Sequence, residues 1–198
     1  MSLKLDAVKS LNKEKQKPAA KQQGYNQSAV FKITVATVLA ALVFVVTSQI
    51  PPIPIPATSG YFNIGETTIY VAALVFGPLV GALSGGIGSA LSDAFLGFGL
   101  FAPGTLLIKG GEGLIVGFLN VNLRKRTSNL TLCATISVIV GGLEMVAGYF
   151  LYEQFVIGYP FAVALAEVPF NIVQMLIGLI VAVPVMHAVF RVIPQLKS

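Results

Sequence analysis

Six apolar runs dominate the chain, separated by short polar, glycine-containing or proline-rich segments. A helix that crosses a bilayer needs about 20 apolar residues, so the pattern predicts an all-α integral membrane protein, a bundle of six transmembrane helices. The second run is the shortest, at about 18 Å if helical. It must extend into the preceding loop, tilt or be shielded by its neighbours. The six runs cover residues 30–50, 66–76, 79–94, 103–123, 130–152 and 161–190.

The second and third runs form one continuous apolar stretch, which Gly77 and Pro78 could either kink or divide by a tight turn. The basic residues decide between one helix and two, because they collect on the cytoplasmic side of membrane proteins. With two helices, the basic tail, the loop 124–126 and the C-terminal basic residues share one side, and only Lys109 of the thirteen lysines and arginines lies elsewhere. The sequence therefore predicts two helices here and cytoplasmic termini. The outward loops are then residues 51–65, 95–102 and 153–160.

Residues 1–28 are predicted to be a basic cytoplasmic tail, and residues 29–198 the membrane domain. The tail contains six lysines, two acids and no aromatic residue except Tyr25. It could form a loosely amphipathic surface helix or stay disordered, and the sequence leaves both interpretations open. No small-residue cleavage site follows the first apolar run, which indicates a retained helix rather than a removed signal peptide.

Composition supports the membrane interpretation and excludes several others. The chain is 55% hydrophobic and only 11% charged, with a mean hydropathy of +0.82, unlike an ordinary soluble domain. The net charge of +5 does not indicate a nucleic-acid partner, because the basic residues fall at loops and ends. Cys133 is the only cysteine, so an internal disulfide and a cysteine-based metal site are both excluded.

Small residues recur every four positions along the third run, in two neighbouring rows. Such spacing lets helix backbones approach closely and predicts tight helix packing. Ala36 and Ala40 form a similar small patch in the first run, for which internal packing is favoured over a docking surface on these residues alone. The two rows are Gly77, Gly81, Gly85 and Ser89, and Ser84, Gly88 and Ser92.

Ionisable residues inside apolar helices are costly and usually face a bundle interior or a polar cavity. Lys109 and Glu112 lie three residues apart, so they share a helix face and can neutralise each other, either as a structural ion pair or as ligand-binding groups. Glu167, Asn171 and Gln174 follow the spacing i, i+4, i+7 and form one polar stripe on the last helix. The stripe is the strongest ligand candidate, because packing alone does not need it.

The remaining buried-type polar residues lie in other helices. Glu144 belongs to the fifth run, close to Tyr149, whereas Glu66 and Asp93 lie near helix ends, where capping or loop anchoring is favoured. Counted from the outer ends, the polar groups of helices four to six fall between the outer surface and the midplane. This crowding predicts a pocket open to the outer face. The group comprises Lys109, Glu112, Glu144, Tyr149, Glu167 and Asn171.

Three strings of sequence suggest a family. The first outer loop ends in GYFNIGE, the segment across the second and third runs reads LVFGPLVGALSGGIGSALSD, and the fourth run begins with APGTLLIKGGEGLIVG. Together with the six-helix size, these strings resemble the substrate-binding S components of energy-coupling factor (ECF) transporters. The last two are similar to the branch for riboflavin, pyridoxine-type and hydroxymethylpyrimidine-type substrates.

The resemblance implies a subunit in the prokaryotic plasma membrane that captures a vitamin or vitamin precursor from outside the cell. It implies docking on a transmembrane coupling subunit driven by two ATPase subunits, partly through Ala36 and Ala40. Phe44 stands where that small-residue pattern would continue. The chain contains no GxxxxGK[ST] motif, so we expect no cofactor of its own and ATP use by the partners.

The family's pocket is built by the first outer loop and helices four to six. No tryptophan is present, so ring stacking must come from tyrosine or phenylalanine. Three glutamates against one lysine favour a neutral or cationic ligand with hydrogen-bond donors, such as a pyrimidine or pyridine ring, and the resemblance also allows a flavin. No catalytic or metal-binding residue is expected. The substrate-binding residues carried over are Tyr61, Asn63, Lys109, Glu112, Glu144, Tyr149, Glu167, Asn171 and Gln174.

Two other classes of protein fit the sequence less well. An intramembrane enzyme needs a nucleophile–base pair or a metal cluster, and one histidine and one cysteine far apart give little support. A stand-alone secondary transporter or channel commonly shows internal repeats or a polar path through both leaflets, whereas here the polar groups crowd one half. The sequence therefore predicts a substrate-capture subunit that is not an enzyme, with the transporter or channel as the alternative.

Overall fold

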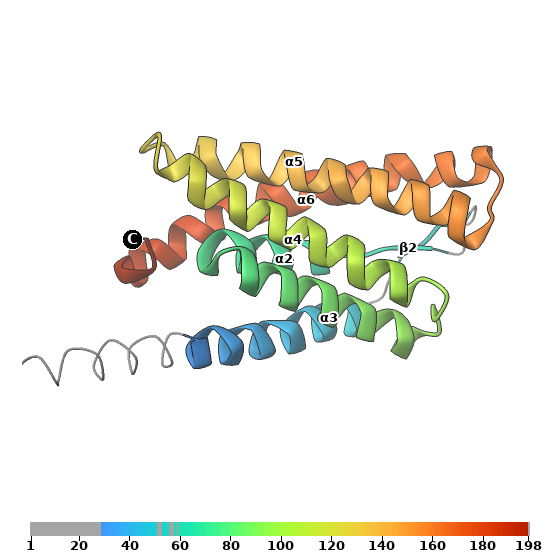
Figure 1. Ribbon diagram of the computed structural model, residues 1–198, viewed down its shortest axis with the longest axis horizontal. Coiled ribbons are helices and arrows are strands. Elements are labelled where there is room, and N and C mark those ends of the chain that lie inside the picture. The colour runs from blue at the N-terminus through green and yellow to red at the C-terminus, as the bar shows by residue number, and fades with distance from the viewer. Residues whose placement is uncertain (1–28, 51–52, 56–57, 59, 198) are drawn as a thin grey trace, which may run out of the picture. The chain divides into compact units, whose positions relative to one another are not determined.

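The computed structural model describes residues 29–197 apart from 51, 52, 56, 57 and 59, and the described part is mainly helical (Figure 1). The predicted tail, residues 1–28, lies outside the described residues. The chain divides into two compact units, residues 1–34 and residues 35–198. Of the first unit, residues 29–34 are described, and they form the first turns of a helix.

The six predicted helices are confirmed, with bounds that differ by a few residues. Five of them are long and apolar enough to cross a membrane, and α2, at 12 residues, is the short one that the sequence predicted. The helices are the first helix Ala29–Gln49, α2 (Gly65–Phe76), α3 (Pro78–Leu96), α4 (Ala102–Arg124), α5 (Leu130–Tyr152) and α6 (Phe161–Val192). Shorter elements are the antiparallel strands β1 (Ile53–Pro54) and β2 (Tyr61–Phe62), the π-helical turn η1 (Glu153–Ile157) and the 3-10 turn η2 (Pro194–Lys197).

A single residue, Gly77, separates α2 from α3. Its φ of +88° lies where side chains are disfavoured, and Pro78 opens α3 at a position where its missing N–H costs nothing. The helices then fold back as an antiparallel hairpin, in which Gly81 lies against Ala73 and Gly85 against Ile69. The prediction of two helices rather than one kinked helix is confirmed.

The small-residue rows of α3 let two neighbouring helices approach closely, as predicted. A Cβ atom on Gly81 would lie 2.7 Å from the Gly113 carbonyl oxygen in α4, and one on Gly85 would lie 2.8 Å from that of Lys109. On the other side, a Cβ atom on Gly88 would lie 2.6 Å from the Ala40 carbonyl oxygen in the first helix. Helix α3 therefore packs directly on the helix that carries Lys109, and Figure 1 shows α3 and α4 side by side.

Ala36 and Ala40 take part in this internal packing. They are only 2% and 8% exposed, and Ala36 belongs to a cluster with Ala72 and Val80. Internal packing, which the residues alone favoured, is confirmed. The docking role of Ala36 and Ala40 stays a prediction from the resemblance, and a partner would meet these side chains only if this packing opened.

The α4–α5 loop and the C-terminal end of α6 lie at the same end of the second unit. The Arg124 guanidinium lies 5.0 Å from the centre of the Phe190 ring, and the Thr131 hydroxyl and His187 Nε2 are 2.9 Å apart. This common end is what the distribution of basic residues predicted. That it faces the cytoplasm stays a prediction.

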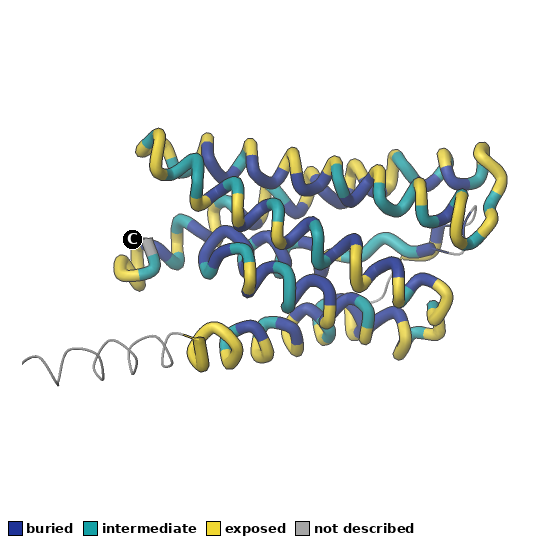
Figure 2. The backbone as a smooth tube through the Cα atoms, in the orientation of Figure 1, coloured by how far each residue is buried: buried dark blue, intermediate teal, exposed yellow. Residues whose placement is uncertain are grey.

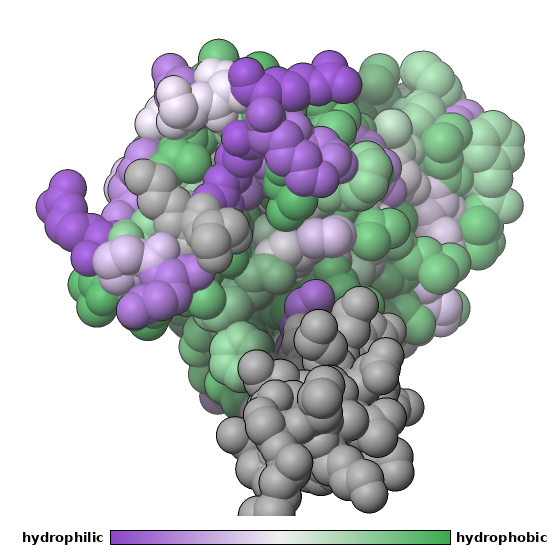
Figure 3. All heavy atoms as spheres, turned by 60° about the vertical axis from the view of Figure 1, so that its left-hand side comes forward, coloured by the Kyte–Doolittle hydropathy of each residue, from purple (hydrophilic) through white to green (hydrophobic). Residues whose placement is uncertain are grey.

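Large apolar side chains cover much of the described surface, as expected for helices surrounded by lipid. In Figure 2 the buried residues lie along the helix faces that meet other helices, and the exposed residues lie along the outward faces. Figure 3 brings forward the end with the α4–α5 loop and shows hydrophilic residues gathered there, beside surface that is mainly hydrophobic with scattered polar residues.

Candidate functional site

A cavity lies at the opposite end of the second unit, where the first helix, α3 and α5 end and α2, α4 and α6 begin. The empty space among its residues is ≈ 480 Å³ including the open mouth, which is an upper limit for a bound molecule. Crowding of polar groups in one half of the bundle predicted a pocket at this depth, and the structure places one there. Seven of the predicted binding residues line it: Tyr61, Asn63, Lys109, Tyr149, Glu167, Asn171 and Gln174.

The other two predicted binding residues, Glu112 and Glu144, are not among the residues that line the cavity. Glu112 is fully buried behind Lys109 and lies outside the lining. Glu144 points from α5 toward Gly111 of α4, where a Cβ atom would lie 3.1 Å from its Oε1. The sequence could not separate these two from the lining residues, because depth along a helix does not tell which face meets the cavity.

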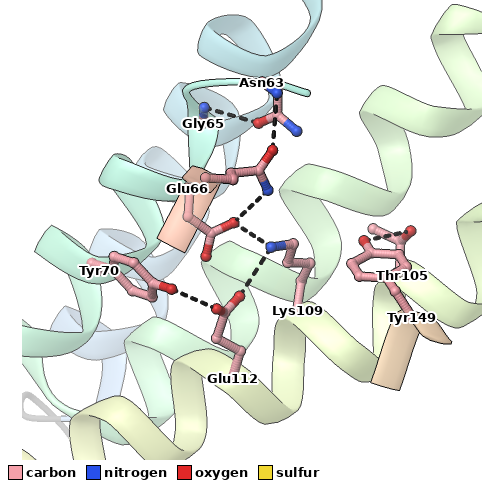
Figure 4. Close-up of polar contacts among 9 residues, drawn as sticks. Asn63, Gly65, Glu66, Tyr70, Thr105, Lys109, Glu112 and Tyr149 are labelled. Atoms are coloured by element: carbon pink, nitrogen blue, oxygen red, sulfur yellow. Dashed lines mark hydrogen bonds and ion pairs between the residues drawn. The ribbon is translucent and has the colours of Figure 1, made fainter. Parts of the chain in front are cut away.

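Lys109 occupies the floor of the cavity and forms ion pairs with two buried glutamates, Glu66 and Glu112 (Figure 4). Its Nζ is 3.1 Å from Glu112 Oε2, the pair predicted from the i, i+3 spacing. The Tyr70 hydroxyl donates to Glu112 Oε1 at 2.8 Å. Gln174 donates to Glu66 Oε2 at 3.0 Å. We call Lys109, Glu66 and Glu112 the lysine triad.

Glu66 was expected to cap a helix or anchor a loop, and the structure corrects this. Glu66 does lie in the first turn of α2, but its carboxylate is 1% exposed and bonds to Lys109, which is 43 positions away. One carboxylate, Glu112, was already near Lys109 in sequence, so local spacing gave no reason to look for another. Only the close packing of α2, α3 and α4 brings Glu66 to Lys109.

The polar stripe of α6 also holds the first outer loop. Gln174 Oε1 accepts a hydrogen bond from the Asn63 backbone N–H at 2.9 Å, while its amide donates to Glu66. Asn63 Oδ1 in turn accepts from the Gly65 N–H at 2.9 Å (Figure 4). The loop backbone, α6 and the lysine triad are therefore one hydrogen-bonded network.

Asp93, at the end of α3, anchors the loop as predicted and also lines the cavity. It accepts a hydrogen bond from the Tyr61 hydroxyl at 2.5 Å. Burial raises the pKa of Tyr61 well above its usual value, and the charge of Asp93 raises the pKa further. The phenol therefore stays neutral and remains a donor to Asp93.

Aromatic rings form part of the wall of the cavity, as the absence of tryptophan required. The Tyr61 and Phe98 rings lie 4.7 Å apart, centre to centre. Lys109 Nζ lies 5.6 Å from the centre of the Tyr149 ring, close enough for a cation–π contact. The Tyr149 hydroxyl is 3.0 Å from Thr105 Oγ1 (Figure 4). Phe98 and Phe101 were not predicted, although the three phenylalanines of the predicted 95–102 loop were a visible signal.

Glu167 binds the first outer loop from the far side of the cavity. Its carboxylate accepts a hydrogen bond from the Thr58 hydroxyl, which itself accepts from the Gly60 N–H at 3.1 Å. A Cβ atom on Gly60 would lie 2.7 Å from Glu167 Oε2, so a larger residue there would push the Glu167 carboxylate aside. The Tyr159 hydroxyl donates to the Thr58 carbonyl oxygen at 2.7 Å and ties the loop to the start of α6.

Glu153 is a buried acid that sequence reasoning missed. It fell at the start of the predicted outer loop 153–160, but α5 continues there as the π-helical turn η1, and Glu153 is 0% exposed. A glutamate next to a helix end gives no signal of burial. Within the described residues, no group of three or more histidine, cysteine or acidic side chains could hold a metal ion.

Comparison with known proteins adds independent evidence about the family. A family model described as ECF-type riboflavin transporter, S component, matches residues 27–191. The thiamine precursor transporter HmpT of Lactococcus lactis subsp. cremoris (strain MG1363) is 30% identical over 152 residues, 76% of this chain and 82% of that protein. An uncharacterized protein of Pyrococcus woesei is 42% identical over 136 residues, 69% of this chain and 86% of that protein.

A solved structure of the S component of a bacterial ECF transporter resembles this one. The TM-score is 0.64 at 17% sequence identity, and the match covers 86% of this chain and 99% of the other. At this level of identity the likeness shows a common fold.

Proposed function

This chain belongs to the S-component family of ECF transporters, and from that premise we propose that it is the substrate-capture subunit of an ECF-type uptake system. It is a multi-pass membrane protein and a transporter component, not an enzyme. The cavity at the loop end binds a vitamin or vitamin precursor. The mouth of this cavity faces outward, as the distribution of basic residues predicts.

The observation that carries the proposal is the combination of polar groups and rings around one cavity. Tyr61, Phe98, Phe101 and Tyr149 offer aromatic faces for a flat ring. Asp93, Glu167 and the amides of the α6 stripe offer acceptors at its edge. A heteroaromatic ligand with N–H or O–H donors matches both features.

The charges near the cavity favour a neutral or cationic ligand. Lys109 is already engaged by two carboxylates, so the lysine triad carries a net negative charge when both are ionised. Asp93 and Glu167 add further acids to the lining. A ligand with a carboxylate would meet these groups without a free cation and would be disfavoured.

A hydroxymethylpyrimidine-type ring fits these requirements, and a flavin is the second candidate. HmpT is a thiamine precursor transporter, and the matching family model describes a riboflavin transporter component. Both are heteroaromatic ligands with donor groups. Asp93 and the α6 stripe bind the donors, and the rings of the cavity stack on the flat face.

Transport requires partners in this proposal. The chain lacks a P-loop motif, so a transmembrane coupling subunit and two ATPase subunits supply ATP hydrolysis. Affinity purification of this protein, tagged and expressed in its own cells, should also recover the coupling subunit and the ATPase subunits. Uptake by the chain alone in ATP-free proteoliposomes would instead show a secondary transporter or channel.

The first experiment is to purify the protein in mild detergent, denature it and identify the released small molecules by mass spectrometry and absorbance. Titration calorimetry with hydroxymethylpyrimidine, riboflavin and biotin then ranks the candidates. We expect stoichiometric binding of one heteroaromatic compound and no binding of biotin. The carboxylate of biotin would need a cation, and Lys109 of the described lining is already paired with two glutamates. Tight biotin binding would contradict the proposed ligand class.

A further inference from the structure

We infer that Glu153 is a positioning residue of the cavity: as a neutral carboxylic acid it donates a hydrogen bond to Glu167 and holds Glu167 as an ionised acceptor for the ligand. This inference rests on the proposed function of the cavity and deepens it. Glu153 does not line the cavity, so it acts on the ligand through Glu167. It would make the Glu167 side of the cavity selective for a ligand with a hydrogen-bond donor.

The first observation is that Glu153 is buried and unpartnered. Its side chain is fully buried, and within the described residues neither carboxyl oxygen has a hydrogen-bond donor. Its position is well defined, because its backbone carbonyl accepts the Tyr159 N–H at 2.9 Å where η1 ends. π-helical turns are rare and frequently mark functional sites, and this one directs Glu153 inward.

The second observation is what surrounds this carboxyl. Tyr159 and Thr58 link the two acids: the Tyr159 N–H donates to the Glu153 carbonyl oxygen, the Tyr159 hydroxyl donates to the Thr58 carbonyl oxygen, and the Thr58 hydroxyl donates to Glu167. Each of the two carboxyls influences the ionisation of the other, and both influence the Tyr159 phenol. Burial raises the pKa of Tyr159, and the two acids raise the pKa further, so the phenol stays neutral. In the described part of the chain, neither acid forms an ion pair with a lysine or arginine. We call Glu153 and Glu167 the carboxyl pair.

One bound proton removes the repulsion between the two carboxyls. Two adjacent carboxylates in a buried site repel each other and lose hydration, so both cannot be ionised without a cation. One proton bound from water converts the repulsion into an O–H···O hydrogen bond. The pair then carries one negative charge and titrates as a unit.

The hydrogen bonds decide which acid holds the proton. Glu167 accepts from the Thr58 hydroxyl and borders the cavity, and both features stabilise its charged form. Glu153 has no donor within reach and no exposed surface. The proton therefore resides on Glu153, and Glu167 receives two donors that leave its remaining acceptor positions for the ligand.

The test compares two variants of the full chain in detergent. Glu153→Gln keeps a neutral donor of the same length, whereas Glu153→Leu removes the donor at similar volume. We expect Glu153→Gln to retain binding of hydroxymethylpyrimidine or riboflavin, whichever the wild type binds, and Glu153→Leu to weaken it by about tenfold or more, because a hydrogen bond to a charged group is lost. Gln154→Leu, at the next residue of η1, is the matched control and should bind like the wild type.

Two further measurements separate positioning from general structural damage. In a Glu167→Gln background, Glu153→Leu should cause little additional loss of binding, because the group it positions is gone. Infrared spectroscopy of the ligand-free protein at neutral pH should show a protonated carboxyl band that Glu153→Gln removes. The band does not depend on any ligand, so it tests the inference even if no probe binds and the proposed function fails.

The contrary outcomes are equally concrete. Any of three results would overturn the inference. Glu153→Leu could bind the ligand with wild-type affinity, or it could lose as much affinity in the Glu167→Gln background as in the wild type. The infrared spectrum could also be unchanged by Glu153→Gln.

Discussion

The lysine triad and the carboxyl pair lie near the same cavity and differ in how their buried acids are stabilised. In the triad, Lys109 neutralises Glu66 and Glu112 directly, and Tyr70 and Gln174 donate to the same carboxylates. In the carboxyl pair, Glu153 and Glu167 have no cation within the described residues, and Thr58 is the donor to Glu167.

The difference indicates that the lysine triad has a structural role and the carboxyl pair a binding role. A buried acid that already has its cation contributes to the folded structure and has little capacity left for a ligand. A buried acid without a cation lowers the folding stability unless a proton or a ligand neutralises it or donates a hydrogen bond to it. Such acids are often found in binding sites. We therefore expect changes in the triad to act mainly on stability and changes in the carboxyl pair to act mainly on binding.

The largest expected effect is that of Lys109→Met. It leaves Glu66 and Glu112 buried without their cation, and breaking a buried ion pair in this way costs about 3–5 kcal/mol of folding free energy. Thermal unfolding in detergent measures it. Lys125→Met, which removes an exposed lysine whose side chain donates to Asn122, is the control and should unfold like the wild type. Equal stability of the two variants would remove the structural role of the triad.

Glu167→Gln should weaken ligand binding rather than folding stability, in contrast to Lys109→Met. It removes the charged acceptor that borders the cavity, so binding of the identified ligand should weaken by about 1.5–3 kcal/mol, or roughly tenfold to a hundredfold. Folding stability should change little, because the amide oxygen of glutamine can still accept hydrogen bonds from Thr58 and from the neutral Glu153. Calorimetric titration and thermal unfolding of the same sample give both values. A variant that loses stability but keeps its affinity would reverse our assignment.

Gly85→Ala tests how the triad is positioned. A Cβ atom at Gly85 would lie 2.8 Å from the Lys109 carbonyl oxygen, so α4 must shift away from α3. Overpacking of this kind costs about 1–3 kcal/mol, measured by thermal unfolding. Gly110→Ala alters the same interface, but its nearest contact, at 3.6 Å, is ordinary packing distance. If both variants unfold alike, close packing does not position Lys109.

Glu144→Gln should have the smallest effect. The sequence placed Glu144 among the binding residues, but the structure places it beside Gly111, outside the cavity. Affinity should stay within about twofold of the wild type, since distant substitutions rarely matter more. Titration calorimetry against Glu167→Gln makes the comparison, and a loss as large as that of Glu167→Gln would restore Glu144 to the site.

Local rules predicted much of the fold and part of the site. Apolar runs predicted the six helices, and basic residues together with Gly77 and Pro78 predicted the α2–α3 break. The stripe Glu167, Asn171 and Gln174 was predictable because residues at i, i+4 and i+7 of a helix share a face. The Lys109–Glu112 pair followed from the same geometry.

Other features depend on contacts between distant segments. Glu66 reaches Lys109 only because glycines in α3 allow α2 and α4 to pack closely on it. Glu153 is buried in the π-helical turn that continues α5, which the pattern of apolar residues does not predict. Glu144 and Glu167 look alike as acids in apolar helices, and only tertiary packing puts one beside α4 and the other at the cavity.

The sequence by itself determined that this protein is a helical membrane protein, where its six helices lie to within a few residues, and at which depth its polar groups gather. These properties follow from hydrophobicity and helical periodicity, which act over a few turns of chain. The tertiary structure decided which acids share a cation and which share a proton. That choice depends on distances between side chains of different helices, because electrostatic and hydrogen-bond energies in a buried site change within a few ångströms.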